Sequence, residues 1–283
     1  MITETDIKNA LAELFDETLL SIAPLSAAKH AEIFRITMVN GDNYVAKRAT
    51  PGLKDEAAQL SVLSEKGGLP VPKIHKIDDE LLIMDYIVSD WQMDDSAQKD
   101  AAVHLARLHQ TEGKSYGYDH NTMIAGIPQK NDYHDDWATF FVENRLMYMA
   151  ERTRQIGSLD KDTFKDIEKL TVKVPQIIGT GNPPALIHGD CWGGNILSHR
   201  GKIAAFVDPA IYYADPEIEL AFGTLFNTFD QNFFARYGKE IEIKPGFFEE
   251  RRDLYNLYPL LVHTELFGRS YVRKIKRILK KFD

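Results

Sequence analysis

The chain has 283 residues, of which 44% are hydrophobic and 27% charged, and its formal net charge is −8. This composition is ordinary for a globular protein, and the acidic balance argues against a general nucleic-acid-binding protein. No apolar run approaches the roughly 18 residues needed to cross a membrane. The chain opens without a signal-peptide pattern, and its single cysteine allows no intramolecular disulfide. We therefore expect a cytoplasmic protein that binds neither nucleic acid nor a membrane.

Residues 1–85 predict a small nucleotide-binding lobe in which a helix precedes a run of strands. The segment 1–15 is acidic and amphipathic, which favours a helix, and alternating strands are predicted around Phe34 and Val45. A turn between these strands makes them a hairpin. An apolar strand over residues 81–84 ends the lobe.

Two charged residues of this lobe have the positions of phosphate-binding groups. Lys47 follows three strand residues, and Glu56 lies nine residues later in a helical segment that Gly67 is expected to end. In kinases a strand lysine contacts the α- and β-phosphates, and a glutamate of the next helix holds that lysine. Taken alone, each residue is more often a solvated surface group. The interpretation therefore depends on a matching pattern further along the chain.

Residues 86–283 predict a larger and mainly helical lobe. The segment 94–110 begins with capping residues and continues with apolar residues at helical spacing. Residues 117–136 are rich in Gly, Asn and Asp and predict a long loop on the substrate side. The segment 268–282 places apolar residues on one helical face and basic residues elsewhere, which predicts a helix packed on this lobe with a solvated basic face.

The strongest functional signal is HGDCWGGNIL at residues 188–197, followed by IAAFVDP, which ends at Pro209. Asp190 and Asn195 lie five residues apart in one turn, and Asp208 comes thirteen residues later, after a predicted strand. This order suits phosphoryl transfer from a nucleotide, in which one Asp accepts the proton of a hydroxyl while an Asn and a second Asp bind magnesium. The alternative, a plain β-hairpin with solvated tips, is disfavoured because several requirements of the pattern are met together.

The chain resembles the fructosamine kinase (ketosamine-3-kinase) family of the aminoglycoside-phosphotransferase superfamily. A Trp two residues after the candidate base, and DPA followed by an aromatic pair, are typical of ketosamine kinases rather than of aminoglycoside or choline kinases. The resemblance implies an α+β, protein-kinase-like fold with a small β-rich N-terminal lobe and a larger, mainly helical C-terminal lobe. It is carried by VAKR at 45–48, EAAQL at 56–60, LPVPKI at 69–74, LIMDYI at 82–87, LARLH at 105–109, DDWATFFVENRL at 135–146, HGDCWGGN at 188–195, DPAIYYADPEIELA at 208–221 and FGRSY at 267–271.

The resemblance implies an ATP- and magnesium-dependent kinase that phosphorylates the 3-hydroxyl of a ketosamine, the sugar adduct of a glycated amine. The implied residues are Asp190 as the base, Lys47 for the phosphates, Glu56 to orient Lys47, Asp85, Tyr86 and Ile87 as the adenine-binding hinge, Asn195 and Asp208 for magnesium, and Trp192 and Asp215 for the substrate. Two alternatives remain. One is another kinase of the superfamily acting on an aminoglycoside or amino alcohol, and the other is a non-catalytic nucleotide-binding protein, which should have lost at least one of the lysine, base and metal-binding positions.

Two positions depart from the family pattern. The loop that covers the nucleotide normally contains glycines, but residues 25–34 have none, and the hydroxyl of Ser26 is the expected substitute. Cys191 stands where the family usually has Leu, which predicts a small buried residue, with a redox switch as the alternative. Glu217 and Glu219 are predicted to be structural partners behind the catalytic loop. The sugar, the amine and the oligomeric state are left open.

Overall fold

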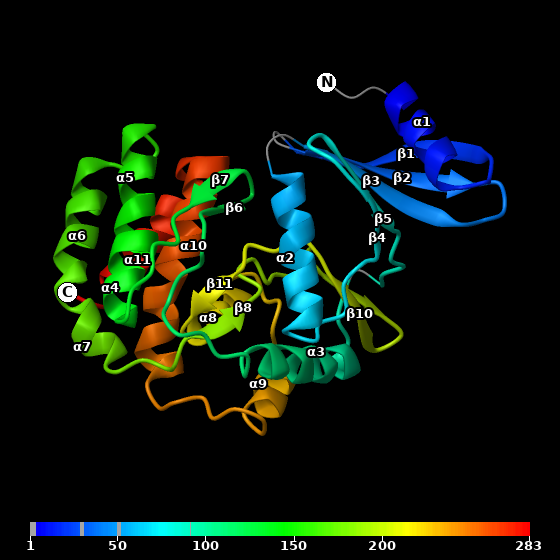
Figure 1. The fold of residues 1–283 in the computed structure, drawn as a ribbon. Coiled ribbons are helices and arrows are strands. Elements are labelled where there is room, and N and C mark those ends of the chain that lie inside the picture. Colours follow the sequence, from blue (N-terminus) through cyan, green and yellow to red (C-terminus); the bar gives the residue numbers. More distant parts are fainter. Residues whose placement is uncertain (1–3, 29–30, 50–51, 91) are drawn as a thin grey trace.

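The computed structural model describes residues 4–28, 31–49, 52–90 and 92–283. Its small lobe contains one five-stranded antiparallel sheet with the strand order β1-β2-β3-β5-β4, accompanied by two helices (Figure 1). These elements are α1 (Glu4–Leu14), β1 (Leu19–Ala28), β2 (Ala31–Met38), β3 (Asn43–Ala49), α2 (Leu53–Glu65), β4 (Ile74–Ile77) and β5 (Leu81–Asp85).

The two faces of this sheet have different partners, because successive strand residues point to opposite sides. Ala46 and Ile83 lie on one face and are buried with the apolar residues of α1. Val45 and Met84 lie on the other face and pack with the first residue of α2. Lys47 comes two residues after Val45, so its side chain shares the face that is turned to α2.

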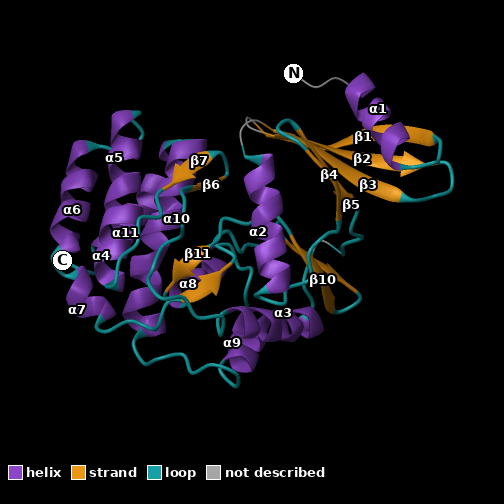
Figure 2. Ribbon diagram, viewed as in Figure 1, coloured by secondary structure: helices purple, strands orange, loops and turns teal. Residues whose placement is uncertain are grey.

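The large lobe is mainly helical (Figure 2). Its helices are α3 (Asp95–Leu108), α4 (Trp137–Phe141), the π-helix η1 (Val142–Leu146), α5 (Met147–Gln155), α6 (Lys161–Thr171), α7 (Val174–Ile178), α8 (Glu217–Leu225), α9 (Gln231–Tyr237), the π-helix η2 (Phe247–Arg251), α10 (Arg252–Phe267), the 3-10 helix η3 (Arg269–Tyr271) and α11 (Val272–Leu279). Three antiparallel strand pairs join them, namely β6 (Thr122–Ile124) with β7 (Ile127–Gln129), β8 (Ala185–Ile187) with β11 (Tyr212–Ala214), and β9 (Ile196–His199) with β10 (Lys202–Phe206).

One extended apolar core fills the large lobe and reaches the base of the small one. Trp137, Phe140 and Tyr255 belong to this core, and so does Leu63 near the C-terminal end of α2. The C-terminal helix α11 buries Val272, Ile275 and Leu279 in the same core, as its apolar spacing predicts. Within the described residues, the structure contains no helix with both the length and the apolar character needed to cross a membrane.

The predicted loop at residues 117–136 differs from the structure in one respect. It contains the short hairpin β6–β7, whose strands have three residues each. Such short strands show no measurable alternation in the sequence, and Gly126 and Pro128 within the hairpin are typical of loops. The polar side chain of Gln129 in this hairpin hydrogen-bonds the carbonyl of Ala210, two residues after Asp208.

Candidate active site

The turn after β8 and the segment after β10 bring three of the predicted residues together. The Nδ2 of Asn195 donates to the carbonyl of Asp190 at 2.9 Å and to Asp190 Oδ2 at 3.0 Å. The same amide lies 3.5 Å from the carbonyl oxygen of Asp208. Asp208 has a φ of 52°, a left-handed conformation that Asp adopts more readily than most residues. The backbone is therefore sharply bent at Asp208, where this residue lies beside the turn that carries Asp190 and Asn195.

Lys47 joins the small lobe to this cluster. Its Nζ lies 2.7 Å from Glu56 Oε2 and 2.5 Å from Asp208 Oδ1, and the residue is 7% exposed. Burial would lower the pKa of Lys47, but the carboxylates of Asp208 and Glu56 outweigh it and raise that pKa, so the ammonium group persists. Burial likewise tends to raise the pKa of Asp208, and Lys47 overcomes this and lowers it.

The carboxyl groups of Asp190 and Glu56 have raised pKa values. Burial, followed by the charge of Asp208, raises the pKa of Asp190 to about 7. Burial also raises the pKa of Glu56 to about 7, although Lys47 opposes the shift. A carboxylate with a pKa near neutrality can accept a proton and release it again at physiological pH, which suits a general base.

Glu219 of α8 anchors the backbone of the turn. It accepts the N–H of Gly189 at 2.7 Å and that of His188 at 3.3 Å, and it lies 2.9 Å from His109 Nε2. Burial would raise the pKa of Glu219, but the hydrogen bond and charge of His109 outweigh it and lower that pKa. The other ring nitrogen of His109 meets the hydroxyl of Tyr237 at 2.8 Å.

His188, Cys191 and Glu219 also lie close enough to be considered as metal ligands. Their ligand atoms are all within 4.8 Å of one another. His188 Nε2, however, bonds the carbonyl of Val207 at 3.0 Å, and both oxygens of Glu219 are hydrogen-bonded. Burial raises the pKa of the Cys191 thiol well above its usual value, so the thiolate needed for metal binding or ready oxidation is disfavoured. These residues form a structural cluster, and Cys191 is buried as expected.

Trp192 is exposed beside the turn. Its side chain lies over Gly194, because a Cβ atom added at Gly194 would come within 2.4 Å of the indole ring. The residue is 42% exposed. The N–H of the intervening Gly193 donates to the hydroxyl of Thr228 at 2.9 Å. An exposed, flat apolar surface therefore belongs to the same turn as Asp190.

Asp215 lies apart from the cluster. In the β8–β11 pair, Tyr212 opposes Ile187 next to the turn that carries Asp190, whereas Ala214 opposes Ala185 at the other end. Asp215 follows that far end, is 1% exposed, and accepts hydrogen bonds from Asn182 and Glu217. These contacts hold Asp215 in the large lobe, and its contact with the substrate stays a prediction.

The three predicted hinge residues differ in whether their backbone N–H groups are already hydrogen-bonded within the protein. The N–H of Asp85 donates to Lys73, and the N–H of Tyr86 donates to Asn43. Among the described residues, no acceptor is found for the N–H of Ile87. Of the three backbone donors, Ile87 therefore remains for a ligand.

Ser26 lies in β1 near the tip of the β1–β2 hairpin. It opposes Ile33, and Ile33 opposes Lys47 on the next strand. Residues paired in this way share a sheet face. The exposed Ser26 is thus on the same face as Lys47, and the tip of the predicted phosphate loop, residues 29–30, lies outside the described residues.

The donor set suits magnesium. Asp208 offers a carboxylate, and Asn195 directs its Nδ2 toward Asp190, which leaves its amide oxygen for a ligand. Hard divalent cations prefer such oxygen donors.

Gln129 and Tyr258 border the site, although sequence reasoning did not select them. The Nε2 of Gln129 donates to the carbonyl of Ala210 at 3.0 Å, and Gln129 Oε1 accepts the hydroxyl of Tyr258 at 2.8 Å. Gln129 is 81 residues from Ala210 and 129 residues from Tyr258, so no local spacing could reveal this contact.

Comparison with known proteins identifies the family. The fructosamine kinase family model matches residues 22–282. The chain belongs to the fructosamine kinase family. A probable ketoamine kinase of Vibrio parahaemolyticus is 31% identical over 233 residues, which cover 80% of this chain and 78% of that protein. A probable ketoamine kinase of Synechocystis is 38% identical over 181 residues, covering 63% of this chain and 59% of that protein.

Solved structures confirm the predicted fold of this fructosamine kinase family member. A candidate fructosamine-3-kinase of Thermobifida fusca has a TM-score of 0.88 at 25% identity, with 98% of each chain covered. An aminoglycoside phosphotransferase in complex with AMP-PNP and hygromycin B has a TM-score of 0.70 at 16% identity, again over 98% of each chain. The second similarity shows the fold alone. Together they establish the α+β, protein-kinase-like architecture.

Proposed function

We propose that the protein is an ATP-dependent ketosamine-3-kinase that phosphorylates the 3-hydroxyl of fructosamine or ribulosamine adducts, a step in deglycation repair. The observation that carries the proposal is the single cluster of Asp190, Asn195, Asp208, Lys47 and Glu56 in a chain of the fructosamine kinase family. In kinases these residue types supply a base, metal ligands and a phosphate-binding lysine.

Nucleotide binding is assigned to the face of the small lobe that carries Lys47. Lys47 contacts the α- and β-phosphates, Glu56 holds it in place, and Ser26 on the same sheet face contributes a hydroxyl. The adenine ring is bound at the hinge after Asp85, where the N–H of Ile87 is the available donor. Asn195 and Asp208 hold magnesium, which neutralises negative charge on the phosphates.

Asp190 is the general base. Its carboxylate accepts the proton of the sugar 3-hydroxyl while that oxygen forms a bond to the γ-phosphorus. The bond between the γ-phosphorus and the bridging oxygen breaks, and ADP leaves. The products are the ketosamine 3-phosphate and ADP. Because phosphoryl transfer depends mainly on positioning, the anchored turn is the main contribution of the large lobe.

Trp192 is assigned to the substrate. An open-chain ketosamine is flexible, so one of its secondary hydroxyls must be aligned with the γ-phosphate. The exposed indole, supported on Gly194, offers a flat apolar wall for the carbon chain. The alternative acceptor, an aminoglycoside or amino alcohol, is supported only by similarity of fold.

One assay separates these acceptors. Purified protein is supplied with ATP and magnesium, ADP release is measured with fructosamine and ribulosamine adducts of lysine, kanamycin and choline, and the phosphate is located by NMR. We expect preference for a ketosamine and phosphate on its 3-hydroxyl. Preference for kanamycin or choline, or phosphate at another position, would refute the proposal. Asp190→Asn serves as the inactive control.

A further inference from the structure

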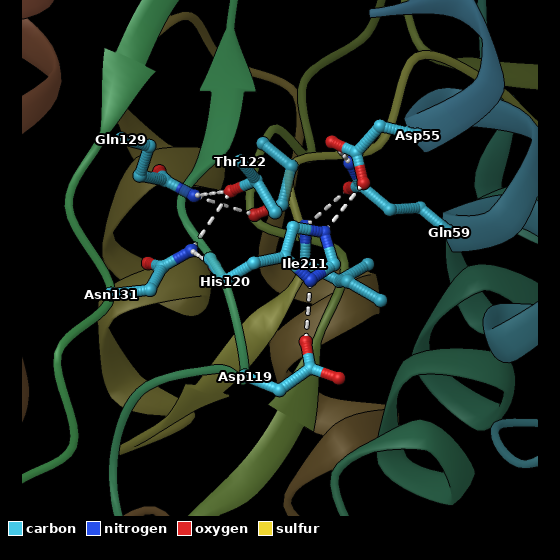
Figure 3. Close-up of polar contacts among 9 residues, drawn as sticks. Asp55, Gln59, Asp119, His120, Thr122, Gln129, Asn131 and Ile211 are labelled. Atoms are coloured by element: carbon cyan, nitrogen blue, oxygen red, sulfur yellow. Dashed lines mark hydrogen bonds and ion pairs between the residues drawn. The ribbon is translucent and has the colours of Figure 1, made fainter.

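Helix α2 is tied to the large lobe by side chains next to Glu56. Asp55 and Gln59 lie one turn apart on this helix, so they share a face. Gln59 Nε2 donates to Asp55 Oδ2 at 2.7 Å, and Gln59 Oε1 accepts the backbone N–H of Ile211 at 2.9 Å. Ile211 follows Asp208 by three residues, so Gln59 links the helix of Glu56 to the segment of the candidate metal ligand (Figure 3).

His120 makes a second tie to the same helix. Its Nε2 lies 2.7 Å from Asp55 Oδ1, and its Nδ1 lies 2.5 Å from Asp119 Oδ1. Ionised carboxylates only accept, so an imidazole bonded to both carries two ring protons and a positive charge. The hydrogen bond with Asp55 raises the pKa of His120. The charged groups that face His120 are Asp55 of α2 and Asp119 of its own loop, and the ring of Tyr118 packs beside it.

The β6–β7 hairpin supports both ties from the large-lobe side (Figure 3). Gln129 Nε2 donates to Thr122 Oγ1 at 2.9 Å and to the carbonyl of Ala210 at 3.0 Å. Asn131 Nδ2 donates to Thr122 Oγ1 at 3.0 Å and to the carbonyl of His120 at 3.1 Å. These hairpin side chains are buried. The backbones of His120 and Ala210 are thus held by one set of connected, buried side chains.

The two ends of α2 meet the large lobe differently. Leu63, near the C-terminal end, is buried in the apolar core of the large lobe. The N-terminal half, which carries Glu56, meets that lobe through the polar ties of Asp55 and Gln59. If α2 moves relative to the large lobe, it swings about this packed end, and the hydrogen-bonded end moves most. The polar ties therefore limit how far the part of α2 that carries Glu56 can move from the large lobe.

We propose that Gln59 and His120 are positioning residues that hold α2 against the large lobe, so that Glu56 meets Lys47, and that the charge on His120 adjusts the affinity for nucleotide. Neither residue contacts the reacting groups. Protonated His120 binds Asp55, so the tie weakens as the pH rises through the His120 titration. The kinetic part of this proposal rests on the proposed function, whereas the structural part does not.

The structural part is tested by amide hydrogen exchange in α2. Gln59→Leu deprives the Ile211 N–H of its acceptor, and exchange at residues 56–60 is expected to become about tenfold faster. His120→Ala should increase it about threefold, because a half-exposed ion pair contributes less. His134→Ala removes another partly exposed histidine beside a carboxylate and should leave this exchange unchanged. Wild-type exchange in both Gln59→Leu and His120→Ala would overturn the proposal.

The kinetic part is tested by the KM for ATP. Gln59→Leu should raise it about tenfold and His120→Ala about threefold, with smaller changes in kcat, since Asp190 belongs to the other lobe. The wild-type KM should rise as the pH increases beyond the ordinary pKa of histidine, because the pKa of His120 is raised by its hydrogen bond with Asp55, whereas His120→Lys keeps a fixed charge and removes that part of the rise. Identical pH dependence in wild type and His120→Lys would overturn the proposal.

The same measurements distinguish failure of the proposed function. If exchange in α2 rises in the variants but no ketosamine is phosphorylated, the proposed function is refuted and the positioning role stands. The affinity for ADP, measured by calorimetry, then replaces the KM as the second readout, with the same expected ratios between variants.

Discussion

The two sides of the site are held by different kinds of contact. The turn that carries Asp190 is anchored inside the large lobe, where Glu219 accepts backbone N–H groups in a fully buried setting. The pair of Lys47 and Glu56 lies in the small lobe, and it meets the large lobe through Asp208 and a few polar ties of α2, one of them at the half-exposed His120. The geometry around Asp190, the proposed base, is therefore a property of one folded core, whereas the geometry around Lys47, the proposed phosphate-binding residue, depends on how the lobes meet.

Removal of the anchor is expected to have the largest effect. Glu219→Ala leaves the N–H groups of His188 and Gly189, and the ring of His109, without their buried acceptor. Breaking such a buried polar cluster should lower the free energy of unfolding by about 3 kcal/mol or more. Glu13→Ala, which removes an exposed carboxylate paired with a surface lysine, should cost less than about 1 kcal/mol. Chemical denaturation measures both, and equal small losses would mean that the turn is not anchored in this way.

Asp190→Asn tests whether the large lobe contributes to the chemical step while the small lobe contributes to nucleotide binding. The substitution removes the proton acceptor and keeps the size of the side chain, so kcat should fall about a hundredfold or more. The affinity for ADP should stay near that of the wild type, because Lys47 and Glu56 are unchanged. Steady-state kinetics and calorimetry give the two values. A variant that keeps most of its turnover would remove Asp190 from the mechanism.

The pH dependence of kcat/KM should show the ionisation of the base. Asp190 must be ionised to accept a proton, and its pKa of about 7 lies above the usual range because of burial and Asp208. The rate should therefore fall about tenfold per pH unit below this value and level off above it. Glu56 also has a pKa near 7, so Glu56→Gln is the control. If the acidic limb disappears in Glu56→Gln, the titration belongs to Glu56.

The parts of the site that could be predicted are those coded within short segments. Asp190 and Asn195 share one turn, and Lys47 and Glu56 lie nine residues apart on adjacent elements, so spacing and residue type were sufficient to predict that the side chains of each pair meet, whereas their roles stay predictions. The fold was predicted through the resemblance that these motifs carry. Asp215 was selected from the same resemblance, and its role stays a prediction; its place after β11, at the end of the β8–β11 pair away from Asp190, depends on strand pairing that spacing does not encode.

The interlobe contacts could not be predicted for a related reason. Asp55 and His120 are 65 residues apart, and Gln59 and Ile211 are 152 residues apart. Contacts at such separation leave no periodic pattern in a single sequence. Polar residues such as Gln59 and Gln129 also read as ordinary surface positions until the fold buries them.

The smallest expected effect concerns Trp192, which tests whether the exposed part of the anchored turn serves the substrate. A Cβ at Gly194 would lie 2.4 Å from the indole, so Gly194→Ala must displace that ring. The ring is exposed and can move, so the fold should survive. We expect the KM for the ketosamine to rise about threefold while the KM for ATP stays unchanged, because only the substrate wall shifts.

Gly193→Ala is the matched control, since its added Cβ would find its nearest neighbour, Thr228 Oγ1, at 3.7 Å, an ordinary contact. The two variants add the same methyl group one residue apart in the same turn. A general loss of loop flexibility would therefore affect both, whereas displacement of the indole affects Gly194→Ala alone. Equal KM values for the ketosamine in the two variants would mean that the position of Trp192 does not matter to the substrate, and the exposed indole would need another explanation.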